Sequence, residues 1–151
     1  CLIALLGVAL VIYIRYRSIK ILIPMMLTSL SEVVIILGFA ALINWNLDVA
    51  AIAGIIAAIG TGVDSQIVII DENIKGKREQ SRGWAHTMKN AFFIIFASYA
   101  TTTAAMLPLW NAGAGLFRGF AITTIAGITI GVFLTRPAFA AIAEMLFKNK
   151  E

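Results

Sequence analysis

The sequence predicts an all-α membrane protein, built as a bundle of about five transmembrane helices. Hydrophobic residues make up 60% of the 151 residues and charged residues 13%, and the mean hydropathy is +0.92. A water-soluble domain of this composition would expose large apolar patches. The apolar residues fall into runs separated by short polar segments, and about five runs of roughly 20 residues use up the chain. We therefore expect no soluble domain within these residues.

Polar or helix-breaking residues bound each expected span. The first span ends at the basic turn that begins at Arg15, and the second ends at the polar tripeptide NWN. The fourth stops at Pro108 and the fifth stops before Arg136 and Pro137, because proline breaks the hydrogen-bonding pattern of a helix. The expected spans are residues 1–14, 21–43, 49–70, 91–107 and 117–134, with a polar loop over 71–90 and an amphipathic helix after the fifth span.

Basic residues indicate the orientation, because Lys and Arg concentrate in short cytoplasmic loops. One side of the expected topology carries Arg15, Arg17, Lys20, Lys75, Lys77, Arg78, Arg82, Lys89, Arg136, Lys148 and Lys150. The other side carries only Arg118. We infer that the first side, including the loop over 71–90, is cytoplasmic. Basic clusters at the ends of apolar runs also argue against nucleic-acid binding.

The start of the chain indicates a piece of a longer protein. Cys1 lies inside an apolar run, without a preceding Met or the features of a signal peptide. We expect a missing upstream domain on the extracytoplasmic side. The single cysteine excludes an internal disulfide, and the sequence has no metal-ligand cluster or phosphate-binding loop, so no metal or cofactor is expected.

Two carboxyl groups lie deep inside expected spans. Asp64 is well inside the third span, and Glu32 is near the middle of the second. An ionisable group at that depth costs at least about 2.5–3.5 kcal/mol, so it predicts a role in moving protons or ions. The alternative is a protonated or hydrogen-bonded group that only joins helices. Gly60 and Gly62 leave space beside Asp64 for water or a partner, which favours Asp64 as the main proton relay and Glu32 as a second one.

Small and hydroxylated residues predict where these helices pack. In the third span they form a face that includes Thr61 and Asp64, and in the fourth span they form one that includes Thr101 and Thr102. Small residues let backbones approach closely in a membrane. We expect the two faces to pack together, with the threonine hydroxyls as partners of Asp64. No basic residue is expected deep in any span, so a partner protein would supply the positive charge.

The run GTGVD at residues 60–64 is similar to the signature of intramembrane aspartyl proteases. Here Val63 separates the second glycine from the aspartate. That chemistry also needs a second aspartate to activate water, and no other aspartate lies inside an expected span. We therefore expect no enzymatic activity.

Three segments together resemble the SecD family of protein-export membrane subunits. The run GTGVDSQIVI at residues 60–69 is similar to the family's Gly-x-x-Val-Asp core, TTTAA at 101–105 to its Thr-Thr element, and GLFRGFAI at 115–122 to the opening of its last span. Gly62 and the pair Ser65-Gln66 resemble the archaeal form. The resemblance covers essentially the whole chain and corresponds to the family's second to sixth spans.

The resemblance implies a proton-gradient-driven accessory of the general secretory channel in the cell membrane. It implies half of a larger pseudo-symmetric, permease-like assembly with a SecF-like subunit, and contact with exported polypeptides through the missing domain. It adds Gln66 as a polar residue at a helix interface and Gly119 as a motif glycine. Arg118, just outside the fifth span, is either an interface anchor or a contact to a partner. The alternatives are a proton-coupled exporter of lipids or small hydrophobic molecules from the resistance-nodulation-division superfamily, and a purely structural subunit.

The topology can be tested at Ser81, in the middle of the polar loop. After Cys1→Ser, the Ser81→Cys variant should react with an impermeant thiol reagent only from the cytoplasmic side, because five basic residues hold this loop there. Labelling is compared between intact cells and inverted vesicles. Reaction at Ser81→Cys in intact cells would reverse the orientation.

Overall fold

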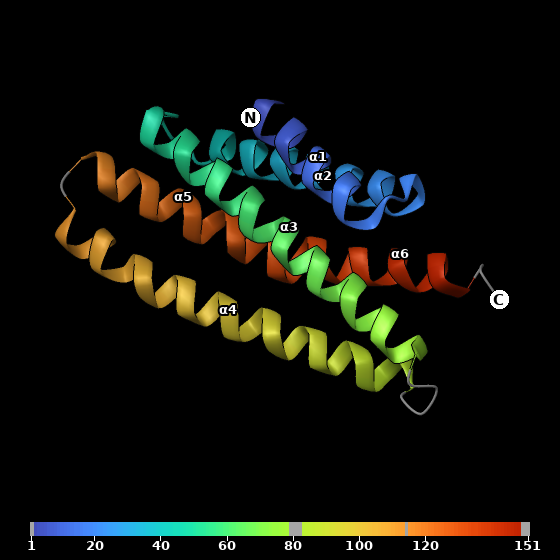
Figure 1. Cartoon of the computed structure of the whole chain (residues 1–151). Coiled ribbons are helices and arrows are strands. Elements are labelled where there is room, and N and C mark those ends of the chain that lie inside the picture. The colour runs from blue at the N-terminus through green and yellow to red at the C-terminus, as the bar shows by residue number, and fades with distance from the viewer. Residues whose placement is uncertain (1, 79–82, 114, 149–151) are drawn as a thin grey trace.

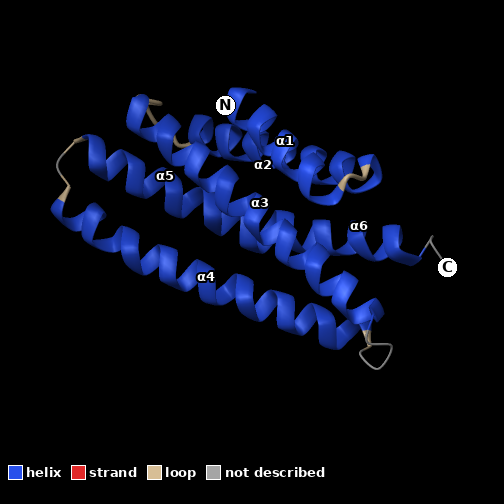
Figure 2. Ribbon diagram, viewed as in Figure 1, coloured by secondary structure: helices blue, strands red, loops and turns tan. Residues whose placement is uncertain are grey.

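The computed structural model describes residues 2–78, 83–113 and 115–148, and every regular element in these ranges is helical (Figure 2). The elements are α1 (Leu2–Tyr16), α2 (Ile19–Leu42), α3 (Val49–Arg78), α4 (Trp84–Ala112), α5 (Leu116–Ile130), the π-helical turn η1 (Gly131–Thr135) and α6 (Arg136–Lys148). Four runs are long and apolar enough to cross a membrane, namely Ile19–Leu42, Val49–Lys75, Ala85–Ala112 and Leu116–Met145, and Leu2–Tyr16 is a shorter apolar helix. The predicted membrane helix bundle is confirmed.

The helices α1, α2, α3, α4 and α5 run in alternating directions along the bundle, and α6 continues in the direction of α5 (Figure 1). The adjoining ends of α1 and α2, the adjoining ends of α3 and α4, and the end of α6 all lie at one end of the bundle. The adjoining ends of α2 and α3, and of α4 and α5, lie at the other. This arrangement agrees with the alternation expected from the basic residues, so we refer to these ends as the expected cytoplasmic and extracytoplasmic ends.

Several helices extend beyond the boundaries expected from the sequence. Helix α3 continues past Ile70 to Arg78 and α4 begins at Trp84, so most of the expected loop over 71–90 is helical. Met88 and Ala91 of α4 are buried in one cluster with Ile69 and Ile70 of α3. Since Lys, Arg and Glu are good helix formers, these helices continue into polar sequence while one face stays packed. Ser81 lies outside the described residues.

The prolines also do not end the helices where we expected. Pro108 lies inside α4, which continues to Ala112. The fifth span does not end at Leu134, because α5, η1 and α6 form one helical run through Pro137. A membrane helix tolerates proline where a local π turn or neighbouring helices compensate for the lost hydrogen bond. The consequence is that Arg136 lies inside the bundle.

Helix α3 packs most closely against α5, through glycines on both helices. A Cβ at Gly127 of α5 would lie 2.5 Å from Ala58 Cβ of α3, and a Cβ at Gly54 of α3 would overlap the Thr123 hydroxyl of α5. Helix α4 lies at the edge of the bundle and joins α5 through the Tyr99 and Thr129 hydroxyls, 3.0 Å apart. Gly54 and Ala58 of α3 therefore face α5, which corrects the expected pairing of the small faces of the third and fourth spans.

Polar contacts connect the helix ends. At the expected cytoplasmic end, Arg15 of α1 forms an ion pair with Asp71 of α3 (2.7 Å), and the Tyr16 hydroxyl donates to the other oxygen of Asp71 (2.7 Å). At the opposite end, Asp48 accepts a hydrogen bond from Ala51 N (2.7 Å) and caps the start of α3. These contacts hold the start of α3 and a position two turns before its other end.

Candidate functional site

A buried ion pair joins α2 and α6 in the interior of the bundle. Arg136 Nη1 lies 2.9 Å from Glu32 Oε1, and the exposed fractions of these side chains are 0% and 1%. Arg136 Nη1 also donates to the Thr135 hydroxyl (2.9 Å), and that hydroxyl lies 3.4 Å from Glu32 Oε2. An ion pair in a low-dielectric interior stabilises the fold only when its geometry and hydrogen bonds are good, and removing one partner is strongly unfavourable.

This pair corrects two expectations. We expected Arg136 in a cytoplasmic loop, and we expected no cation inside the chain that could pair with Glu32. The apolar sequence resumes after Pro137 with AFAAIA at residues 138–143. That resumption is the signal for a continuous span from Leu116 to Met145. We missed this continuous span because we placed the end of the helix before Pro137.

The π-helical turn precedes Arg136 and determines its placement. The Arg136 backbone N–H donates to Gly131 O, five residues earlier, which is the π pattern. Pro137 follows at once, and a proline ring clashes with the carbonyl four residues before it in a regular α-helix. The wider turn accommodates this constraint and rotates the residues that follow it. Arg136 then faces Glu32 from the start of α6.

Two glycines provide the space for the ion pair. A Cβ at Gly62 of α3 would lie 2.9 Å from Glu32 Oε2 and 3.1 Å from Arg136 Nη2, and a Cβ at Gly131 would overlap Arg136 Nη1. Any larger residue at either position would displace these buried charged groups. Gly62, expected to make room beside Asp64, in fact makes room for Glu32 and Arg136. A Cβ at Gly60 would meet nothing within 4 Å in this chain.

Asp64 lies on the opposite side of α3, where its side chain is exposed on the bundle surface. It shares this surface with residues at helical spacing that are exposed or half-buried. We call these residues the outer stripe of α3: Ala53, Ala57, Gly60, Thr61 and Asp64. Within the described residues, no ion pair or side-chain hydrogen bond involves Asp64. Asp64 and Glu32 therefore have different surroundings. Glu32 forms an ion pair with a cation of the same chain, and Asp64 has no such partner among the described residues.

The expected polar partners are divided between the inside and the outside of the bundle. Thr61 donates to Ala57 O (3.1 Å) and Thr101 donates to Ala97 O (2.9 Å), so both hydroxyls bond to their own helix rather than to Asp64. Thr101 is exposed and Thr102 is half-buried. Gln66 is fully buried. Neither atom of its amide has a hydrogen-bond partner among the described residues.

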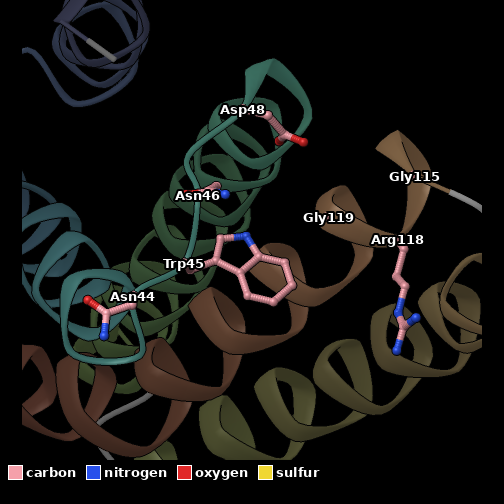
Figure 3. Close-up of a pocket in the computed structure, with 7 residues that line it drawn as sticks. All are labelled: Asn44, Trp45, Asn46, Asp48, Gly115, Arg118 and Gly119. Atoms are coloured by element: carbon pink, nitrogen blue, oxygen red, sulfur yellow. The ribbon is translucent and has the colours of Figure 1, made fainter.

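Gly119 and Arg118 lie at an open pocket near the expected extracytoplasmic end (Figure 3). The pocket has a volume of about 470 Å³. Its walls are Asn44, Trp45, Asn46 and Asp48 from the α2–α3 connection and Gly115, Arg118 and Gly119 from α5 and its start. A Cβ at Gly119 would lie 3.5 Å from Asp48 Oδ1. Arg118 points away from Asp48 and is exposed.

The ion pair predicts a strong coupling between two substitutions. Arg136→Met and Glu32→Met should each lower the stability by about 3–5 kcal/mol, because each leaves one charge unpaired in the interior. The double variant should lose much less than the sum, since both charges are gone and the thioether side chains can pack. Thermal unfolding of the full-length protein in mild detergent measures all three variants.

The matched control is the half-exposed ion pair of Arg15 and Asp71. Its double-mutant cycle should show a much smaller coupling, because water screens both charges. Additive losses for Arg136→Met and Glu32→Met would contradict a pair that acts as one unit.

Comparison with known proteins agrees with this architecture. Residues 1–148 match the family model described as protein export membrane protein SecD/SecF, C-terminal. The chain is 58% identical over 148 residues to the protein-export membrane protein SecD of Methanocaldococcus jannaschii, covering 98% of this chain and 37% of that protein. It is 56% identical to the SecD protein of Thermococcus gammatolerans (95% of this chain, 28% of that protein) and 46% identical to that of Haloferax volcanii (96% and 28%).

The chain thus spans between about a quarter and two fifths of the length of these relatives, all from archaea. The resemblance to SecD in the motifs at residues 60–69, 101–105 and 115–122 is confirmed by a match over nearly the whole chain. The four long apolar helical runs agree with a protein of the membrane. The chain belongs to the SecD/SecF family of protein-export membrane proteins and forms its C-terminal membrane region.

Proposed function

We propose that this membrane region uses the proton gradient to assist export of polypeptides through the general secretory channel, and that Asp64 carries the proton. Relatives at 46–58% identity have names that refer to protein export. A role in Sec-associated export follows from that family. The proposal adds the energy source, the carrier residue and a membrane partner.

The observation that carries the proposal is the uncompensated position of Asp64. Its side chain is exposed on the bundle surface, more than half-way along the apolar part of α3. A charged carboxylate that faces lipid at this depth has a large free-energy cost. The Asp64 carboxyl group is therefore either neutral or in contact with polar groups of a partner. Hydrocarbon favours the neutral form, and water or a cation favours the charged form. A small displacement of α3 against a partner would therefore drive proton uptake on one side and release on the other.

The surroundings of Glu32 favour a structural role rather than proton transport. Its charge is matched inside the chain by Arg136, and Thr135 adds a hydroxyl. A carboxylate held by an internal cation has a reason to be in the membrane that does not involve a gradient. We therefore assign proton coupling to Asp64 and helix positioning to Glu32.

Asp64→Asn tests the carrier, because it keeps the size and most hydrogen bonds of the side chain and removes its titration. In the full-length protein, gradient-dependent export should fall at least about a hundredfold, which is the lower end of what a positioned proton-transfer group contributes. Export of a secreted reporter from energised cells, with and without a protonophore, measures it. Asp71→Asn is the matched control, because Asp71 is on the same helix near the expected cytoplasmic end and should leave export unchanged. If Asp64→Asn assembles and exports at the normal rate, Asp64 does not carry the proton.

The partner should cover the outer stripe of α3. Four of its five residues are small, which permits close approach of another helix, and the fifth is the uncompensated carboxyl of Asp64. We expect a SecF-like protein to co-purify in mild detergent and Ala53→Cys to crosslink to it. Leu6→Cys, on the exposed face of α1, is the matched control and should not crosslink. A stable, active protein without a partner would contradict this assignment.

A further inference from the structure

Several buried polar atoms of the ion pair and of neighbouring residues have no hydrogen-bond partner among the described residues. Arg136 Nε and Nη2 have no partner among the described residues, and the same is true of both amide atoms of Gln66 and of the Ser29 hydroxyl. The exposed fractions of the three side chains are 0%, 0% and 2%. A buried polar atom without a partner costs free energy comparable to a lost hydrogen bond, so five of them together require an explanation.

These atoms come from three helices that meet at the ion pair. Gln66 lies one turn beyond Gly62, the residue of α3 that faces Glu32 and Arg136. Ser29 lies one turn before Glu32 in α2, and residues three or four apart share a helix face. Because α2 and α3 run in opposite directions (Figure 1), one turn forward in α3 and one turn back in α2 lead toward the same end of the bundle. Gln66 and Ser29 therefore lie on the same side of the pair, toward the expected cytoplasmic end.

We propose that Arg136, Gln66 and Ser29 bind water at the place where α2, α3 and α6 meet beside this ion pair. Arg136 offers donors, Ser29 and the Gln66 carbonyl offer acceptors, and the Gln66 amide adds two further donors. A water molecule both donates and accepts, and buried waters make about three such bonds to groups that would otherwise be unsatisfied.

The charges of the site favour water over an ion. Glu32 and Arg136 already cancel, so an anion such as chloride would add a net negative charge to the interior, and a cation would lie beside Arg136. A neutral ligand adds no charge. The site is independent of the proton-coupled function proposed for Asp64, because that residue lies on the outer stripe on the other side of α3.

Gln66→Met distinguishes a hydrated site from a dry one by the sign of its effect. In a hydrated site the substitution removes a hydrogen-bond partner of the bound water, so the melting temperature of the full-length protein in mild detergent should fall by several degrees. In a dry site it removes an unsatisfied amide, and the melting temperature should rise. Ile69→Met, a buried apolar exchange on the same helix, measures the cost of repacking alone. A rise with Gln66→Met relative to Ile69→Met would overturn the proposal.

A map of the wild-type protein at a resolution that shows water provides the second measurement and needs no variant. We expect a density peak within about 2.7–3.2 Å of Arg136 Nη2 or Nε and of the Gln66 amide or Ser29 hydroxyl. A direct contact between Gln66 and Arg136 with no such peak would overturn the proposal. So would an anomalous peak at this place after chloride is replaced by bromide, because the ligand would then be an anion.

Discussion

The ion pair between Glu32 and Arg136 is the interaction on which the packing of α2, α3 and α6 depends. Two full charges at 0% and 1% exposure are tolerable only as partners, so α6 must lie where Arg136 reaches α2. Gly62 and Gly131 have no side chains where a Cβ would meet the charged groups. The π-helical turn before Pro137 brings the guanidinium into place. Four local features of the chain are thus explained by one electrostatic constraint.

The two membrane carboxyl groups have different surroundings. Glu32 has a cation and a hydroxyl within the chain, and its free energy of burial is offset locally. Asp64 has an exposed face beside Ala57, Gly60 and Thr61, residues small enough for another helix to approach. A group that the chain leaves uncompensated is the one whose charge can respond to a moving partner. This asymmetry separates a structural charge from a candidate coupling charge within a single subunit.

Close packing through glycine makes α3 the central helix. Gly54 lies against Thr123, and Gly127 of α5 lies against Ala58, so the backbones of α3 and α5 approach without large side chains between them. Such an interface depends on shape rather than on a hydrophobic driving force, because lipid is as apolar as the helices. Displacing α3 would therefore move Asp64 and would alter the contacts of α3 with α5 and with the Glu32 and Arg136 pair.

The sequence by itself determined the fold class, the alternation of the helices and the depth of Asp64 and Glu32, because bilayer thickness fixes the length of an apolar run and the cost of a charge within it. The motifs at residues 60–69, 101–105 and 115–122 were sufficient to indicate the family. Only the tertiary structure decided that Arg136 is inside, that Glu32 is paired and that Asp64 faces outward. Helical spacing assigns residues to faces but does not say which face meets which neighbour. A proline inside a span has the same sequence signal as a proline at its end, since only the packing around it determines whether the helix continues.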